Sequence, residues 1–255
     1  MNYVRPKKSL GQHFLNDKNI AKKIVDSLNY DGNVLEIGPG KGILSGYLKE
    51  KYGDKLKVIE IDRESVEFLN LNSGLQKEQI IGADFLEIPV SEIFNSSYAI
   101  IGNFPYNIGS QIFFKVLENR NQIPEVVCMI QKEVAQRIAE KPGSRVYGIL
   151  SVLLQAFYKI EYLFTVNEQV FTPPPNVKSA VIRLTRNERA ELDCEERLFF
   201  MVVKTAFNQR RKTLSNSLKS LMNGKKSDLP IFLKRPEHLS VDEFVELTNL
   251  IALTR

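Results

Sequence analysis

Short apolar runs alternate with amphipathic segments between residues 17 and 140, and this alternation constrains the fold more than any other feature of the sequence. The apolar runs are hydrophobic on both faces, as expected for strands that helices cover on both sides, and they span residues 33–37, 56–61, 79–83, 98–102 and 126–130. The segments between them have helical periodicity and span 17–28, 43–51, 63–71, 110–118 and 131–140. This order predicts a doubly wound α/β fold with a mostly parallel sheet.

The chain changes character near residue 186. Before that point we expect a further helix at 146–158 and strands at 159–166 and 178–184. After a polar stretch the pattern becomes helical, with helices expected at 195–208, 211–221, 230–234 and 241–253. We therefore predict a large domain at residues 1–185 and a small all-helical domain at residues 186–255.

Positive charge is concentrated in two stretches of a chain whose formal net charge is +5. Residues 1–16 and residues 197–227 contain basic side chains and no acid. Concentrated positive charge is typical of a protein that binds a polyanion, although a solvated surface is the alternative. The candidate polyanion contacts in these stretches are Arg5, Lys7, Lys8, Arg210, Arg211 and Lys212.

Composition narrows the class of protein. No apolar stretch approaches the ~18 residues that a membrane span needs, so no membrane association is expected. Cys128 and Cys194 lie far apart, and the cysteines and histidines show no ligand spacing, so we predict no disulfide framework and no metal site. A reducing cytoplasm is the expected location.

A glycine-rich segment, Gly38-Pro39-Gly40-Lys41-Gly42, follows the first predicted strand and precedes a predicted helix. Glycine allows a sharp turn and the close approach of a ligand. The third glycine comes one residue too early for the dinucleotide fingerprint, so a bound pyrophosphate is not the favoured ligand. The segment instead favours a nucleoside that packs against Gly38 and Gly40. A tight turn without a ligand is the alternative.

Acidic residues end the next two predicted strands. Glu60, followed by Ile61, stands where an acid accepts hydrogen bonds from ribose hydroxyls. Asp84 ends the third strand, where its carboxylate or the neighbouring amides can recognise an adenine edge while Phe85 packs on the ring. Ligands bind at the carboxyl ends of parallel strands, so these residues predict a site for a nucleoside cofactor.

The segment Asn103-Phe104-Pro105-Tyr106 ends the fourth predicted strand. An adenine amine is a poor nucleophile because its lone pair is delocalised into the ring. The side-chain oxygen of Asn103 and the carbonyl of Phe104 or Pro105 can accept the two amine hydrogens and turn the lone pair toward a methyl donor. Tyr106 offers a face on which the base can stack. Together with the glycine-rich segment, the motif predicts methyl transfer from S-adenosylmethionine to adenine N6, without a strong general base.

Phe171 precedes Thr172-Pro173-Pro174-Pro175. A rigid proline-rich loop is a suitable mount for a second ring opposite Tyr106, so Phe171 is predicted to stack on the target base together with Tyr106. Packing of Phe171 in the core is the alternative.

Several segments together resemble the ribosomal RNA adenine dimethylases. The resemblance extends over nearly the whole chain and rests on residues 8–15, 35–42, 58–62, 102–108, 131–138, 147–152, 171–184 and 207–214. It implies a Rossmann-like class I methyltransferase sheet whose last strand is antiparallel, followed by a helical RNA-binding domain. It also implies S-adenosylmethionine contacts at His13, Leu15, Gly38, Glu60, Asp84 and Asn103.

The resemblance further implies a substrate. It implies dimethylation of two adjacent adenosines in the 3′-terminal hairpin loop of 16S rRNA, within the 30S particle and late in its assembly. The basic stretches then suit RNA phosphates. We expect a monomer.

Other functions are compatible with parts of the pattern. A 23S rRNA adenine methyltransferase of the macrolide-resistance type resembles the chain in fold and in the motif at 103–106. A DNA adenine methyltransferase shares the chemistry, but no target-recognition domain is evident. An assembly factor that binds the 30S particle without methylating it is the alternative outside enzymes, and Glu60, Asp84 and Asn103 argue against it.

Overall fold

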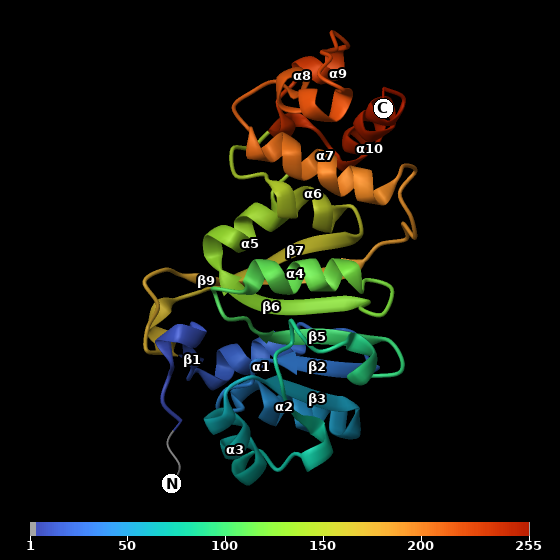
Figure 1. Ribbon diagram of the computed structural model, residues 1–255. Coiled ribbons are helices and arrows are strands. Elements are labelled where there is room, and N and C mark those ends of the chain that lie inside the picture. Colours follow the sequence, from blue (N-terminus) through green and yellow to red (C-terminus); the bar gives the residue numbers. More distant parts are fainter. Residues whose placement is uncertain (1–3, 255) are drawn as a thin grey trace. The chain divides into compact units, whose positions relative to one another are not determined.

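The computed structural model describes residues 4–254, which form two compact units (Figure 1). The first unit comprises the chain up to Ala135 together with Ile160–Arg186. The second comprises Gln136–Lys159 and the chain from Asn187 onward. The chain leaves the first unit for the last time after Arg186. Residues 136–159, which were expected in the first domain, group instead with the C-terminal helices.

Within residues 4–254, a seven-stranded sheet has the order β4-β3-β2-β5-β6-β9-β7. Its strands are β2 (Asn33–Ile37), β3 (Leu56–Glu60), β4 (Ile80–Gly82), β5 (Tyr98–Asn103), β6 (Glu125–Gln131), β7 (Tyr158–Val166) and β9 (Ser179–Arg186). The pairs β2–β3, β2–β5, β3–β4 and β5–β6 are parallel, and β9 runs antiparallel to β6. The predicted α/β class, the mostly parallel sheet and the antiparallel late strand are confirmed.

Helices cover both faces of this sheet, which explains why its strands are apolar on both sides. The helices of the first unit are α1 (Lys18–Asp26), α2 (Ile43–Tyr52), α3 (Arg63–Asn72) and α4 (Gly109–Glu118), and α5 (Lys132–Ala139) begins in the first unit and ends in the second. Buried residues of α1 and α2 form one core cluster with Val34, Val58 and Ile101 of the sheet. On the other side Phe113 of α4 packs edge-to-face on Phe104, with ring centroids 6.0 Å apart.

The strand order creates a crevice at one edge of the sheet. The chain passes from β2 to β3 on one side of β2, and β5 then pairs with its other side. Ligands of open α/β sheets bind where the strand order reverses, outside the carboxyl ends of the strands. Gly38 directly follows β2, and Glu60 and Asn103 are the last residues of β3 and β5.

A short strand pair lies apart from the main sheet. Strand β1 (Phe14–Leu15) pairs antiparallel with β8 (Phe171–Thr172), joining Phe14 to Thr172 and Leu15 to Phe171. This pair was not predicted, because two-residue strands have no periodicity that a sequence can display. It fixes the N-terminal segment to the loop that contains the three consecutive prolines.

The second unit is helical. Its helices are α6 (Ile149–Gln155), α7 (Glu196–Asn208), α8 (Leu214–Ser217), α9 (Pro230–Leu233) and α10 (Val241–Ala252). The Phe207 ring packs against Tyr147 at 6.2 Å and against Phe244 at 6.0 Å, measured between ring centroids. The prediction of one helix at 211–221 was wrong. The chain there forms α8 and a 3₁₀ turn, Lys219–Met222, and Asn216 Nδ2 bonds Thr213 Oγ1, a local bond that competes with a regular helix.

Two negative findings concern the same described residues. None of their helices is long and apolar enough to cross a membrane. No group of three or more His, Cys, Asp or Glu side chains among residues 4–254 is arranged to hold a metal ion.

Gly102 tests the packing between β2 and β5. A Cβ at this position would lie 2.4 Å from the carbonyl oxygen of Ile37, whereas a Cβ at Gly46 in α2 would meet nothing within 4 Å. We expect Gly102→Ala to destabilise the protein by about 1–3 kcal/mol, because backbone atoms of neighbouring strands must separate. Gly46→Ala should leave stability unchanged or raise it slightly. Thermal unfolding of both variants measures this, and equal midpoints would contradict the strand packing.

Candidate functional site

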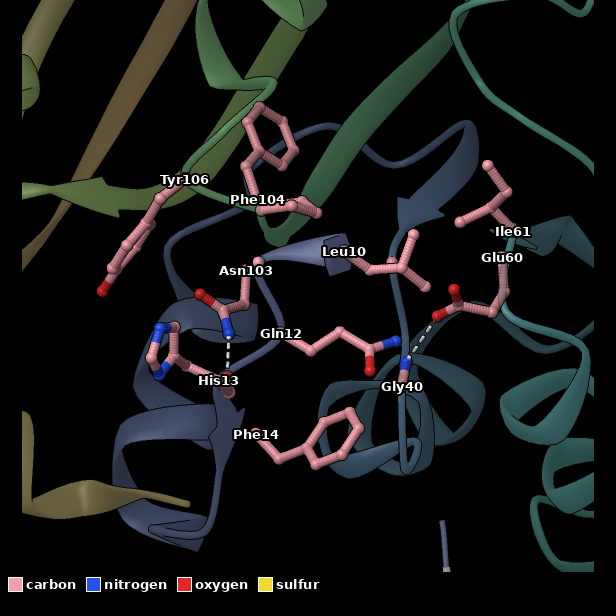
Figure 2. Close-up of a pocket in the computed structure, with 13 residues that line it drawn as sticks. Leu10, Gln12, His13, Phe14, Gly40, Glu60, Ile61, Asn103, Phe104 and Tyr106 are labelled. Atoms are coloured by element: carbon pink, nitrogen blue, oxygen red, sulfur yellow. Dashed lines mark hydrogen bonds between the residues drawn. The ribbon is translucent and has the colours of Figure 1, made fainter. Parts of the chain in front are cut away.

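A hollow opens at the carboxyl ends of β2, β3 and β5, and the N-terminal segment at residues 10–14 forms one of its walls (Figure 2). It lies within the first unit. It is lined by Leu10, Gly11, Gln12, His13, Phe14, Gly38, Gly40, Glu60, Ile61, Asn103, Phe104, Pro105 and Tyr106. The structure therefore brings together most of the residues that the sequence assigned to a cofactor site and a reaction site.

The turn after β2 depends on glycine. Gly40 has a φ of +55°, and a Cβ there would lie 2.7 Å from the Phe14 ring. Gly42 donates to the carbonyl of Pro39 at 2.8 Å, and Gly38 donates to that of Ile59 at 3.0 Å. The first hydrogen bond closes the turn, and the second extends the pairing of β2 with β3. The absence of a side chain at Gly40 lets Phe14 pack directly on the backbone.

Glu60 joins two loops at the end of β3. Its Oε2 accepts the backbone N–H of Gly40 at 3.1 Å, and its Oε1 accepts that of Asp62 at 2.9 Å. The side chain is buried, and burial raises the pKa of Glu60 above its ordinary value, against the lowering effect of these backbone hydrogen bonds. Ile61, beside it, is 52% exposed and presents an apolar face to the hollow.

A hydrogen bond fixes the orientation of the Asn103 side chain. Its Nδ2 donates to the carbonyl oxygen of His13 at 2.9 Å. Because the amide nitrogen is committed to the N-terminal segment, Oδ1 points away from it, on the side of Tyr106 in Figure 2. The hydrogen bond therefore presents an acceptor to the reaction site rather than a donor.

The three residues after Asn103 differ in what they expose. The Phe104 side chain is buried, so only its main chain faces the hollow. The carbonyl of Pro105 accepts the N–H of Ile108 at 3.2 Å. The Tyr106 hydroxyl bonds Ser179 Oγ, burial raises its pKa, and the ring stacks on His13 with a centroid separation of 5.5 Å.

Asp84 and Phe85 lie beside the hollow rather than in its wall. The backbone N–H of Ala83 bonds the carbonyl of Glu60 at 3.1 Å, so Asp84 follows directly from the strand next to Glu60. Asp84 Oδ1 accepts the N–H of Leu86 at 2.8 Å and begins a turn. Phe85 is buried. The Phe85 ring therefore exposes little surface on which an adenine ring could pack.

The predicted role of Phe171 as a stacking ring is contradicted by its position. The Phe171 side chain is 3% exposed and belongs to the core cluster, where it packs with Leu15 opposite it in the β1–β8 pair. Leu15 is likewise buried, so its side chain is part of the core, although it borders a small hollow that Glu36 and Asn103 also line. Burial of Phe171 is the packing alternative that the sequence left open.

The proline-rich loop forms the wall of a second hollow. His13 Nδ1 and the carbonyl of Pro173 are hydrogen-bonded at 2.8 Å. This hollow is lined by Pro6, Lys8, Gly11, Gln12, His13, Tyr106, Gln131, Pro173, Pro174, Pro175, Asn176 and Val177. His13 and Tyr106 line both hollows, so their stacked rings stand between the two.

Comparison with known proteins identifies the family. The model of the family described as "Ribosomal RNA adenine dimethylase" matches residues 4–253. The chain belongs to this family. The chain is also 58% identical to the "Ribosomal RNA small subunit methyltransferase A" of Parabacteroides distasonis, with 97% of this chain and 94% of that protein covered. The protein of the same name from Flavobacterium johnsoniae is 58% identical, with 98% and 97% covered.

Solved structures agree with this rRNA adenine dimethylase fold. A dimethyladenosine transferase from Plasmodium falciparum superimposes with a TM-score of 0.76 at 23% identity, with 95% of this chain and 98% of that chain covered. The 23S rRNA methyltransferase ErmE superimposes with a TM-score of 0.61 at 25% identity, with 92% and 99% covered. The first structure matches the fold more closely.

Among the predicted RNA contacts of this dimethylase, Lys7 is already paired with two acidic side chains. Its ammonium pairs with Asp62 and, at 3.1 Å, with Glu64, and the hydrogen bond that it donates to Asp62 raises the pKa of Lys7. Lys7 thus ties the N-terminal segment to the start of α3. Arg5 and Lys8 are exposed, and Lys8 borders the second hollow.

The other predicted RNA contacts lie in the second unit. Arg210 is part-buried, donates to the carbonyl of Ser144 at 3.3 Å and lies 3.7 Å from Glu237. Arg211 and Lys212 are exposed, and Lys212 bonds Gln209 at 2.8 Å. Arg211 and Lys212 are better placed than Arg210 to meet a phosphate.

Some residues of the site were missed by sequence reasoning. Gln12 bridges the backbone of Lys7, at 2.8 Å, and the carboxylate of Asp62, at 3.3 Å, and Phe14 covers Gly40. No local pattern signals the contacts with Asp62 and Gly40, because these residues are distant in sequence from residues 12–14. Glu36 had a signal, an acid inside an otherwise apolar strand.

The Glu36 carboxyl is buried below the glycine-rich turn. Ser45 Oγ of α2 donates to it, and burial raises the pKa of Glu36 from 4.5 to about 8. The folded state therefore binds a proton that the unfolded state releases between pH 4.5 and about 8. The contribution of Glu36 to the free energy of unfolding falls as the pH rises through this window.

Replacing Glu36 with glutamine removes this titration. We expect Glu36→Gln to gain stability relative to the parent as the pH rises from about 4.5 to about 8, and to show a constant difference below that window. Thermal unfolding across this pH range measures the difference. Glu118→Gln, at an exposed position of α4, is the control. A pH-independent difference for Glu36→Gln would contradict the raised pKa.

Proposed function

We propose that this chain transfers methyl groups from S-adenosylmethionine to N6 of two adjacent adenosines in the 3′-terminal hairpin loop of 16S rRNA within the 30S particle. The family and the relatives named small subunit methyltransferases support the RNA class. The observation that carries the chemistry is the Asn103 amide, whose nitrogen is bound to the His13 carbonyl while its oxygen remains an acceptor at the reaction site.

The amine of the target adenine is activated by two acceptors. Asn103 Oδ1 is the first. The carbonyl of Phe104 is the better second acceptor, because that of Pro105 already accepts the N–H of Ile108. Two hydrogen bonds to the amine hydrogens turn its lone pair out of the ring plane and toward the methyl donor. Each methylation forms an N–C bond and breaks one N–H bond, whose proton leaves to solvent, and a monomethylated amine retains one hydrogen for a second transfer.

The fit of S-adenosylmethionine rests on the hollow at the ends of β2 and β3. The glycine turn allows a ligand to approach the backbone at Gly38 and Gly40, and the carboxylate of Glu60 offers acceptors to ribose hydroxyls. The exposed face of Ile61 suits an adenine ring. When bound there, S-adenosylmethionine supplies a methyl group already activated by its sulfonium sulfur.

The target base enters from the second hollow. Tyr106 lines both hollows and is held by Ser179 on one side and His13 on the other. A ring fixed in this way can support an adenine flipped out of the RNA loop. Lys8 at the rim carries a charge that suits the neighbouring phosphates.

Methyl transfer from labelled S-adenosylmethionine to undermethylated 30S particles tests this function. We expect N6-dimethyladenosine to form in the parent, and Asn103→Ala to reduce the rate about 10²–10³-fold, because one of the two acceptors of the amine is lost. Asn72→Ala, at an exposed position near the end of α3, should leave the rate unchanged.

The substrates used as controls separate the alternatives. Mature 30S particles should accept no methyl groups, and naked 23S rRNA should accept none. Transfer to 23S rRNA alone would show a macrolide-resistance type of enzyme. Binding to undermethylated 30S particles without transfer to either RNA would show a non-catalytic assembly factor.

A further inference from the structure

Lys115 of α4 holds a turn that lies beside the cofactor hollow. Its ammonium donates to the backbone carbonyls of Phe85, Leu86 and Ile88, and its Nζ lies 5.0 Å from the centroid of the Phe85 ring. An ammonium group has three hydrogens, and each has a carbonyl acceptor here. All of these residues belong to the first unit.

The turn held by Lys115 begins at Asp84. The backbone N–H groups of Glu87 and Ile88 bond the Asp84 carbonyl at 3.1 Å each, and Leu86 bonds Asp84 Oδ1 at 2.8 Å. The backbone N–H groups of the turn therefore point toward Asp84. Its backbone carbonyls point toward the Lys115 ammonium. The second oxygen of Asp84 is left to accept a hydrogen bond from a ligand next to Glu60.

Other lysines of the same unit cap carbonyls in a similar way. Lys57 of β3 donates to the carbonyl of Ile93 at 2.6 Å and lies 4.8 Å from the Phe94 ring centroid. Lys51 of α2 donates to Val25 and Leu28. A lysine on carbonyl groups is thus a recurrent way of fixing loops in this protein. Lys115 differs because its turn follows β4 directly beside Glu60, and because α4 begins after the 103–106 motif.

We propose that Lys115 is a positioning residue for the adenine subsite of the cofactor. Its ammonium fixes the turn at 84–88 so that the free oxygen of Asp84 meets the exocyclic amine of the cofactor's adenine. This inference rests on the proposed function, since it assigns a residue to that same site. It also explains why a lysine is tolerated at a position from which α4 could have presented an apolar side chain to Phe85.

The electrostatics of the turn agree with this role. Burial lowers the pKa of Lys115, and the nearby charges of Asp84, Glu118 and Glu87 oppose this effect. An apolar side chain of similar length would leave three carbonyls without their common donor. The turn would then no longer be held in one conformation. Asp84 would keep its charge, but its carboxylate would no longer have a fixed position.

Equilibrium titration with S-adenosylhomocysteine tests the proposal. We expect Lys115→Met to raise the dissociation constant about tenfold, because a subsite that must be ordered on binding has a lower affinity. The turnover number at saturating S-adenosylmethionine should stay within about twofold of the parent, since the acceptors of the target amine lie on another strand. Lys57→Met is the matched control and should bind as the parent does.

Two further measurements distinguish positioning from general stabilisation. S-inosylhomocysteine carries an oxygen where adenine has its amine, so Asp84 should discriminate against it, and Lys115→Met should lose most of that discrimination. Amide exchange at Glu87 and Ile88 should accelerate in Lys115→Met and not in Lys57→Met. If Lys115→Met does not fold, Lys115→Gln, which keeps one donor group, takes its place in the same measurements.

The outcomes separate this inference from the proposed function. Unchanged affinity and unchanged discrimination in a folded Lys115 variant would overturn the positioning role while leaving the methyltransferase intact. An equal loss of affinity in Lys57→Met would also overturn it, because the loss in Lys115→Met would then be explained by general destabilisation of the protein. Failure of the parent protein to bind S-adenosylhomocysteine would instead reject the proposed function.

Discussion

The carboxylate of Glu60 accepts a backbone N–H from each of two loops, and the site depends on this arrangement. One loop is the glycine-rich turn after β2, through Gly40, and the other is the start of α3, through Asp62. The two loops belong to neighbouring strands, and a buried acid without these donors would be costly. Because the acid is satisfied by backbone groups, its position is set by the sheet itself. The hollow therefore opens where β2, β3 and β5 end.

The N-terminal segment completes the site by contacts with distant parts of the first unit. Lys7 and Gln12 bind Asp62, the carbonyl of His13 orients Asn103, and Phe14 covers Gly40. One short stretch therefore contacts the loops after β2, β3 and β5. The same stretch carries Lys8 at the rim of the second hollow, so the expected RNA-contacting surface and the reaction site share one segment.

The sequence predicted those parts of the molecule whose signal is local. Strands apolar on both faces indicated the parallel sheet, and the order of Gly38, Glu60 and Asn103 after successive strands indicated the hollow. Contacts such as that between Lys7 and Asp62 join residues far apart in the chain, and no periodicity reveals them. Phe171 had two compatible roles, because an aromatic side chain before a rigid loop suits both a core and a binding surface. In the structure Phe171 pairs with β1 and its side chain is buried in the core.

Binding of S-adenosylmethionine to Glu60→Gln tests the central claim most directly. Glutamine offers one acceptor oxygen where two backbone donors meet, so the account predicts that affinity falls at least about tenfold, while Glu67→Gln on the exposed face of α3 binds as the parent does. Burial raises the pKa of Glu60, so this carboxylate is protonated at a higher pH than an ordinary glutamate. When the pH is lowered, the affinity of the parent should therefore begin to fall above the pH at which an ordinary glutamate is protonated. Equal affinity of the parent and Glu60→Gln would contradict the account.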